Sequence, residues 1–188
     1  MPKDADIQMR RKHKFDLADI QLLVLDVDGV LTDGKLIINA DGSESKSFNV
    51  LDGHGIKMWQ RAGLKVAFLS GRSCKPTKHR ARELEVDHYF QNCLNKLPIL
   101  EELLKKLGIR KKAVAYIGDD LPDLPIMRYV GFAAAVANAT DEIKRHADYV
   151  TSRDGGNGAV REVIEYILKK TGRWQQLMEK YLSDRRIM

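Results

Sequence analysis

The residues best able to do chemistry are carboxylates that follow short apolar runs. Asp26 and Asp28 come directly after the apolar run 22–25, and a two-residue step along an extended chain returns to the same side, so both can face one site. A denser acidic turn, beginning at Asp119, follows the run 113–117. Several carboxylates that converge without histidine or cysteine repel one another unless a hard cation lies among them. Magnesium is the expected ion, because a few carboxylates, water and phosphate oxygens bind it.

Two further polar groups accompany these carboxylates. Ser70 closes the apolar run 65–69, and Lys96 stands just before the amphipathic stretch 97–107, where it adds a positive charge. Each signal alone has an ordinary structural explanation, since an Asp-Xaa-Asp-Gly segment is often only a turn and a serine commonly caps the next helix. The order of the groups, each about one βα unit from the last, is far more specific than any one of them.

The elements that must position these groups alternate along the chain. Short apolar runs alternate with amphipathic stretches from residue 22 onward, which predicts an α/β fold with a Rossmann-like, doubly wound parallel sheet. Ligands of such sheets bind at the carboxyl ends of the strands, near the point where strand order reverses. The predicted strands are 22–26, 65–70, 87–91, 113–118, 132–136 and 148–151, and the predicted helices are 55–62, 75–85, 97–107, 122–130, 140–146, 158–170 and 173–182.

One segment breaks the alternation. Residues 35–39 and 46–50 have β-like composition and flank Asp41-Gly42, which predicts an inserted β-hairpin. The hairpin follows the first strand directly, where it could overhang a site at that strand's carboxyl end. The predicted domain organisation is a flexible lead-in over 1–19, a single domain over 20–172 and a C-terminal helix and tail over 173–188.

Composition limits the function classes. The chain has 188 residues, 44% hydrophobic and 31% charged, which is typical of one soluble globular domain. Its apolar runs are too short to cross a bilayer and its N-terminus is charged, so we expect no membrane partner and a cytoplasmic protein. The two cysteines, Cys74 and Cys93, are too few for a disulfide framework and lack the spacing of a zinc site.

The net charge of +6 raises the possibility of nucleic-acid binding. Eight Lys or Arg and no Asp or Glu lie between Lys57 and Arg82. No pattern of interleaved aromatic residues accompanies them and no nucleic-acid-binding motif is present, so we expect no nucleic-acid partner. A small acidic substrate explains the excess of positive charge equally well, and a solvated helix face accounts for most of these side chains.

The motifs at Asp26, Ser70, Lys96 and Asp119, in that order along the chain, resemble those of the haloacid dehalogenase superfamily of phosphatases. The resemblance implies that Asp26 is the nucleophile, which forms an aspartyl phosphate, and that Asp28 is the general acid and base. It also implies that Ser70 binds the phosphate and Lys96 neutralises charge. The implied ligands of Mg²⁺ are the Asp26 side chain, the Asp28 backbone carbonyl and the Asp119 side chain.

The resemblance narrows to a subfamily that hydrolyses the 8-phosphate of an eight-carbon sugar acid for lipopolysaccharide biosynthesis. It is carried by residues 26–33, 48–56, 118–127 and 155–162. This implies no cap domain, a homotetramer, and a lid built from neighbouring subunits. The predicted substrate-binding residues are Thr32, Arg72 and Arg80; the arginines are eight residues apart, near two helical turns, and suit a carboxylate. Asn92 departs from the pattern, since glycine is usual there.

Alternatives remain open at this stage. A nine-carbon sugar acid 9-phosphate is a competing substrate, because sequence does not separate chain lengths that differ by one carbon. A non-catalytic oligomerisation module of the same fold is a second alternative, although the presence of both Asp26 and Asp28 argues against it. The glycine-rich segment 155–158 either helps to close the site or is a plain loop before a helix capped near Asn157.

Overall fold

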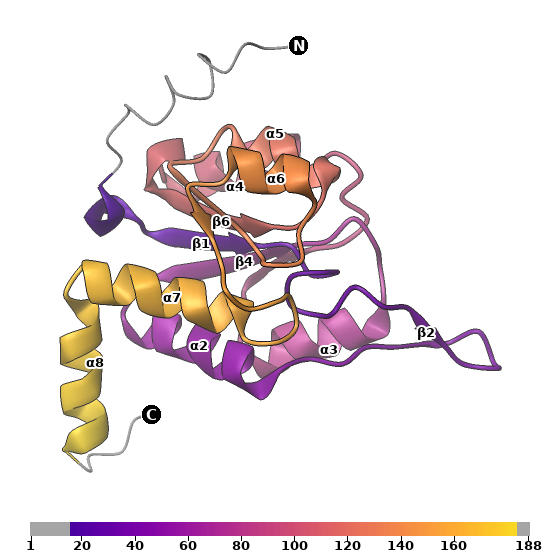
Figure 1. The fold of residues 1–188 in the computed structure, drawn as a ribbon, viewed down its shortest axis with the longest axis horizontal. Coiled ribbons are helices and arrows are strands. Elements are labelled where there is room, and N and C mark those ends of the chain that lie inside the picture. The colour runs from indigo at the N-terminus through magenta and orange to yellow at the C-terminus, as the bar shows by residue number, and fades with distance from the viewer. Residues whose placement is uncertain (1–15, 184–188) are drawn as a thin grey trace.

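A six-stranded parallel sheet forms the centre of the computed structural model, which describes residues 16–183 (Figure 1). The strand order is β5-β4-β1-β6-β7-β8, and every neighbouring pair is parallel. The chain moves outward from β1 in one direction, then returns through β6 on the other side of β1. The order therefore reverses between β1 and β6, where ligands of such sheets bind. The strands are β1 (Leu22–Leu25), β4 (Lys65–Leu69), β5 (His88–Phe90), β6 (Val114–Gly118), β7 (Phe132–Ala135) and β8 (Tyr149–Val150).

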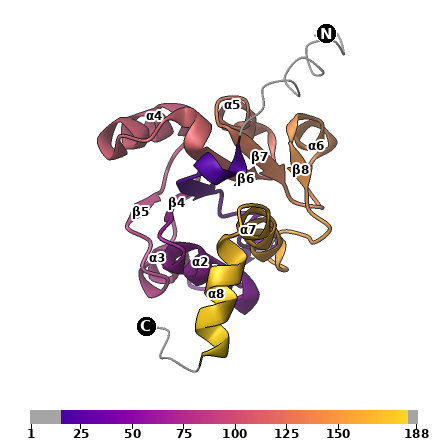
Figure 2. The same cartoon turned by 90° about the vertical axis from the view of Figure 1, so that its left-hand side faces the viewer.

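Helices cover both faces of the sheet (Figures 1 and 2). One face carries α4 (Lys96–Leu107), α5 (Leu124–Met127) and α6 (Asp141–His146), and the other carries α2 (Val50–Arg61), α3 (Lys75–Glu83) and α7 (Ala159–Lys170). The helix α8 (Arg173–Leu182) follows α7 after a left-handed glycine, Gly172. The predicted fold class is confirmed, because the sheet is parallel and doubly wound with helices on both sides.

The inserted hairpin is present, but its second strand lies earlier than predicted. The strands β2 (Ile37–Ile38) and β3 (Glu44–Ser45) pair antiparallel around the turn that contains Gly42, and the hairpin projects away from the sheet (Figure 1). The prediction of a strand over 46–50 is wrong, because residues 46–49 form no ladder and Val50 begins α2. Among residues 16–183 there is, apart from this hairpin, no inserted cap domain.

Two predicted helices need correction. The helix predicted over 55–62 begins at Val50, where the side chain of Asn49 accepts a hydrogen bond from the backbone N–H of Leu51. Gly53 and Gly55 hid this start, because glycine is a poor helix former. A Cβ at Gly55 would lie 3.2 Å from the Cα of Arg161, so this glycine lets α2 approach α7 closely.

The helix predicted over 122–130 is two short pieces, a 3₁₀ turn η3 (Leu121–Asp123) followed by α5. Pro122 and Pro125 each remove a backbone donor, which explains why no longer helix forms. The remaining predicted strands and helices are confirmed to within about two residues, the usual uncertainty at element ends.

The start of the described chain lies against the beginning of α8. Leu17–Asp19 form a 3₁₀ turn, η1, and Arg173 at the start of α8 donates a hydrogen bond to the backbone carbonyl of Ala18 at 3.0 Å. Residues 1–15 and 184–188 lie outside the described residues, and so does most of the predicted lead-in. Among residues 16–183, no helix has the length and apolar composition needed to cross a membrane.

Candidate active site

The strands beside the reversal point carry the two acidic motifs. Asp26 follows β1, and its backbone N–H donates to the Ile117 carbonyl at 3.1 Å, so it continues the β1–β6 ladder. Asp119 directly follows β6. The Asp26 side chain is therefore fixed by the sheet itself, and this residue is only 7% exposed. The sequence pattern located this edge of the sheet correctly.

Three carboxylates meet at this edge. Asp26, Asp119 and Asp123 each offer an oxygen within 4.8 Å of the others. Burial and the charge of Asp123 raise the pKa of Asp26 to about 6, and burial and the charge of Asp26 raise the pKa of Asp119 to about 8. The carboxylates thus oppose one another's ionisation, as expected for a group that holds a divalent cation when ionised.

Asp123 has partners that distinguish it from the other two carboxylates. Its Oδ1 accepts hydrogen bonds from Lys96 Nζ and the Tyr116 hydroxyl, both at 2.6 Å, and its Oδ2 accepts one from the backbone N–H of Asp119 at 2.9 Å. Both oxygens are therefore engaged by protein donors. Asp26 and Asp119 are the better metal ligands, while Asp123 holds the lysine and the acidic turn in place.

Lys96 joins the predicted nucleophile to this scaffold. Its Nζ lies 2.8 Å from Asp26 Oδ1, and its side chain is buried at the start of α4. Burial lowers the pKa of Lys96, but the charges and hydrogen bonds of Asp26 and Asp123 outweigh it and raise the pKa above the usual value. Lys96 is therefore a permanent positive charge beside Asp26. The prediction that this lysine completes the set agrees with its position.

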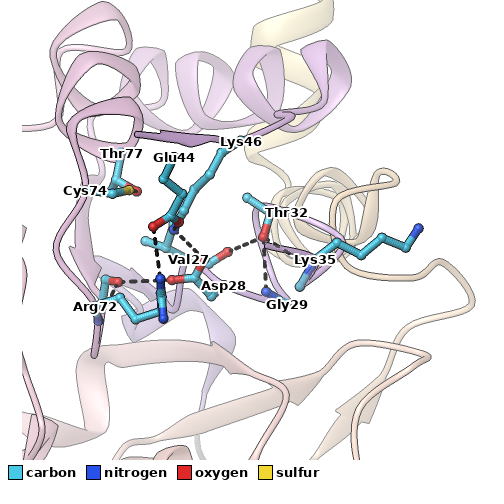
Figure 3. A network of polar contacts seen from close by, with 12 residues as sticks. Val27, Asp28, Gly29, Thr32, Lys35, Glu44, Lys46, Arg72, Cys74 and Thr77 are labelled. Atoms are coloured by element: carbon cyan, nitrogen blue, oxygen red, sulfur yellow. Dashed lines mark hydrogen bonds and ion pairs between the residues drawn. The ribbon is translucent and has the colours of Figure 1, made fainter. Parts of the chain in front are cut away.

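The Asp28 side chain contacts a different set of residues from the Asp26 side chain, and Figure 3 shows its surroundings. Its Oδ1 accepts a hydrogen bond from Lys46 Nζ, and its Oδ2 accepts one from Ser70 Oγ at 3.4 Å. The Asp28 side chain is not among the three carboxylates that cluster, so any metal contact would use its backbone. Ser70 directly follows β4 and is 1% exposed.

Thr32, predicted to bind substrate, is 2% exposed and belongs to the loop that follows Asp28. Its hydroxyl accepts hydrogen bonds from the backbone N–H groups of Gly29 (3.3 Å) and Gly34 (3.2 Å), and it donates to the Val27 carbonyl at 3.4 Å. These contacts use its hydrogen-bonding capacity within the loop (Figure 3). They favour a role in shaping the loop over substrate binding.

Arg72 and Arg80 do not share one helix, because α3 begins only at Lys75. The argument that they point the same way along two helical turns is therefore wrong. Arg72 is half exposed and its Nη2 donates to Glu44 Oε2 at 2.9 Å. Arg80 is largely buried, donates to the Asn49 carbonyl at 3.1 Å, and stacks over the ring of Phe48. Arg72 alone lies beside the polar groups around Asp28.

The glycine-rich segment lies against the loop that carries Asp28. A Cβ at Gly155 would lie 1.7 Å from the Gly29 carbonyl oxygen, and one at Gly156 would lie 2.4 Å from the Thr32 carbonyl carbon. The N–H of Gly156 donates to the Val30 carbonyl at 2.9 Å. The glycines thus permit one backbone to pack directly on another. The helix beyond is capped at Gly158, one residue later than predicted.

Sequence reasoning missed two side chains that organise this region. Lys46 and Asp52 are both buried. Asp52 accepts hydrogen bonds from the backbone N–H groups of Gly158 at 3.1 Å and Arg161 at 2.9 Å, so it caps α7 from another helix. No spacing rule identifies such a contact, because the partners lie more than a hundred residues apart.

Comparisons with known proteins agree with this fold. The family profile described as haloacid dehalogenase-like hydrolase matches residues 90–164. A 3-deoxy-D-manno-octulosonate 8-phosphate phosphatase KdsC from Escherichia coli is 42% identical over 92% of this chain and 88% of its own. The crystal structure of a probable YrbI family phosphatase from Pseudomonas syringae has a TM-score of 0.86 at 45% identity, over 95% of this chain and 98% of that chain.

A further solved structure includes ligands. It is the 3-deoxy-D-manno-octulosonate 8-phosphate phosphatase from Moraxella catarrhalis in complex with a magnesium ion, a phosphate ion and a KDO molecule. Its TM-score is 0.85 at 40% identity, over 95% of this chain and 99% of that chain.

A doubly wound sheet with carboxylates gathered at its reversal point defines a hydrolase of the haloacid dehalogenase class. The chain belongs to the haloacid dehalogenase-like hydrolase family. Within that family its similarity is to the 3-deoxy-D-manno-octulosonate 8-phosphate phosphatases, the subfamily that its motifs resemble.

Proposed function

We propose that this chain is a phosphomonoesterase that hydrolyses 3-deoxy-D-manno-octulosonate 8-phosphate to the free sugar acid and phosphate. The observation that carries the proposal is the convergence of Asp26, Lys96 and Asp119 at the reversal point, with Lys96 Nζ 2.8 Å from Asp26 Oδ1. The relatives' names supply the substrate. A cytoplasmic location is part of the proposal.

Mg²⁺ is the cofactor in this proposal. The donor set fits it, because Asp26 and Asp119 offer hard oxygen ligands and their mutual repulsion, seen in their raised pKa values, is relieved by a divalent cation. The backbone carbonyl of Asp28 is the third proposed ligand. When bound, the ion neutralises charge on the carboxylates and on the phosphate oxygens.

The first chemical step uses Asp26 as the nucleophile. Its carboxylate attacks phosphorus in line with the leaving oxygen and forms an aspartyl phosphate, while Asp28 protonates the departing sugar alkoxide. Lys96 stays charged and balances the negative charge at Asp26. The Ser70 hydroxyl, near Asp28 at 3.4 Å, is placed to donate to a phosphate oxygen.

The second step releases the phosphate. Asp28, now a carboxylate, accepts a proton from the water that attacks the aspartyl phosphate, which returns both residues to their starting forms. This exchange of roles requires Asp28 to stay beside the reacting phosphorus throughout. Its position on a different side from the Asp26–Lys96 pair keeps its carboxylate out of that ion pair.

The sugar acid has its own proposed recognition group. Arg72 is half exposed beside the polar groups around Asp28, so its guanidinium is within reach of a substrate carboxylate, which would compete with Glu44 for it. Arg80, held by the Asn49 carbonyl and by Phe48, supports the neighbouring wall. Thr32 acts through the loop it organises.

A homotetramer whose neighbouring subunits close the site is also part of the proposal. The hairpin supports it, because Leu36, Ile37 and Ile38 are about half exposed or more. Apolar side chains exposed together on a projecting arm are typical of a protein–protein contact.

A panel of sugar phosphates assayed for released phosphate tests the function. We expect the 8-phosphate of the eight-carbon acid to have the highest kcat/KM, activity to vanish with EDTA, and Mg²⁺ to restore it. Preference for a nine-carbon 9-phosphate would correct the substrate. Absence of hydrolysis of every ester, including p-nitrophenyl phosphate, would refute the proposal and favour a non-catalytic module.

A further inference from the structure

A line of charged side chains joins the hairpin to Asp28 (Figure 3). Lys46, just after β3, bonds to Asp28 Oδ1; its Nζ lies 3.6 Å from Glu44 Oε1; and Glu44 in turn bonds to Arg72 at 2.9 Å. The Lys46 side chain is only 1% exposed. A lysine this deeply buried at the end of an exposed hairpin is unusual, since lysine is rarely buried without a partner.

The main partner of Lys46 is Asp28. The distance of 3.6 Å to Glu44 exceeds that of a hydrogen bond, whereas the contact with Asp28 is a charge-assisted hydrogen bond. The Asp28 carboxyl group is therefore the contact that holds the end of the Lys46 side chain.

The other contact of the Asp28 side chain is weaker. Ser70 Oγ reaches Asp28 Oδ2 at 3.4 Å, a long distance for a hydrogen bond between oxygens. The orientation of this carboxylate consequently depends on Lys46. A displacement of about 1 Å in a catalytic group costs on the order of a hundredfold in rate.

We infer that Lys46 is a positioning residue, which holds the Asp28 carboxyl group in the orientation in which its proton passes to the leaving sugar oxygen. The inference rests on the proposed function, in which Asp28 is the general acid. This role makes the hairpin part of the active site, because Lys46 lies between β3 and the start of α2, which together position it. A purely structural Lys46 would only dock the hairpin on the domain.

Lys46→Met tests this inference, because methionine keeps an unbranched side chain and removes the charge. We expect kcat on the sugar phosphate to fall at least about tenfold, with KM changed less than about threefold. The single-turnover burst of p-nitrophenol from p-nitrophenyl phosphate, whose leaving group needs little protonation, should slow less than about threefold, because the burst precedes the water attack that also uses Asp28. Lys46→Arg should recover part of the lost kcat.

Lys35→Met is the matched control on the same hairpin. Its side chain is 80% exposed and its salt bridge to Asp33 is 3.0 Å long. We expect wild-type kinetics on both esters from this variant, because Lys35 has no contact with Asp28 among the described residues. The thermal unfolding temperatures of all variants report whether the fold is kept.

A double-mutant cycle with Asp28→Asn separates positioning from structure. If Lys46 acts through Asp28, Lys46→Met has almost no further effect on kcat in the Asp28→Asn background. Equal losses in both backgrounds, or an equal slowing of aspartyl-phosphate formation from both esters, would overturn the inference. If Lys46→Met unfolds, the same cycle with Lys46→Arg decides. If the wild type is active and Lys46→Met is unimpaired, only this inference is refuted. If the wild type is inactive, the proposed function is refuted as well.

Discussion

The two sides of the site are built differently. The side with Asp26, Lys96 and Asp119 stands on the ends of β1 and β6 and the start of α4, with Asp123 holding it from within. The side with Asp28 stands on a loop whose packing comes from the hairpin and from the glycine-rich segment. The first side is rigid because the sheet positions it. The second depends on contacts between segments distant in sequence, so the two should respond differently to mutation.

The largest effect is expected where the sheet positions the nucleophile. Asp26→Asn removes the attacking carboxylate and a proposed metal ligand while it keeps side-chain volume, so hydrolysis of both the sugar phosphate and p-nitrophenyl phosphate should fall to the blank. The unfolding temperature without metal should not fall, because one of three repelling carboxylates is removed.

Asp87→Asn is the control for that substitution, since Asp87 is exposed at the amino end of β5, at the opposite edge of the sheet. Its kinetics should match the wild type. Phosphate release by Asp26→Asn well above the blank would remove Asp26 from the nucleophile position.

The second largest effect is expected on the side of the site that carries Asp28. Asp28→Asn should reduce turnover of the sugar phosphate by on the order of 10²–10⁴-fold, the usual contribution of general acid–base catalysis. Formation of the aspartyl phosphate from p-nitrophenyl phosphate should be reduced far less, which a single-turnover burst of p-nitrophenol measures. Equal reductions with both esters would show that Asp28 is not the general acid.

The third effect tests the packing of one backbone on another. Gly155→Ala places a Cβ 1.7 Å from the Gly29 carbonyl oxygen, so the loop that carries Asp28 must move. We expect a loss of at least about tenfold in kcat/KM on both esters, and a lower unfolding temperature, because the strain acts on the loop and not on a lid.

Gly63→Ala controls for the loss of a glycine elsewhere, because it has a positive φ of 78° but nothing within 4 Å of its Cβ. It should lower stability by about 1 kcal/mol and leave kinetics unchanged. A Gly155→Ala variant that kept full activity on both esters would remove this segment from the site.

The smallest expected effect is a pH dependence of stability, which comes from the carboxylates of the rigid side when no metal is bound. The folded-state pKa values of Asp26 and Asp119, about 6 and about 8, lie above the ordinary value of 3.8. The folded state therefore binds more protons than the unfolded state across this window, and stability in EDTA should fall as pH rises from about 4 to about 8.

Mg²⁺ should offset this loss, so the rise in unfolding temperature on adding it should be larger at about pH 8.5 than at about pH 6. Asp119→Asn should flatten both dependences. A rise that is the same at both pH values in the wild type would show that these carboxylates do not hold the ion.

The sequence by itself determined the fold class and the edge of the sheet at which the candidate site lies. The alternation of apolar and amphipathic runs determined the parallel sheet, and the position of Asp26, Ser70 and Asp119 at the ends of such runs determined the edge where they meet. This worked because the carboxyl ends of parallel strands share one edge whatever the loops do. The start of α2 was misjudged at Gly53 and Gly55, where close helix packing overrides poor local propensity.

Only the tertiary structure decided the surroundings of Asp28. The contact of Lys46 with Asp28, the packing of Gly155 on Gly29, and the capping of α7 by Asp52 each join segments that are distant along the chain. Thr32 needed the structure for a different reason: its type suggested a ligand contact, whereas its hydroxyl bonds to backbone groups two to five residues away in its own loop. Periodicity and motif spacing do not report such loop conformations, nor contacts between segments that are distant in sequence, because both depend on how the loops fold.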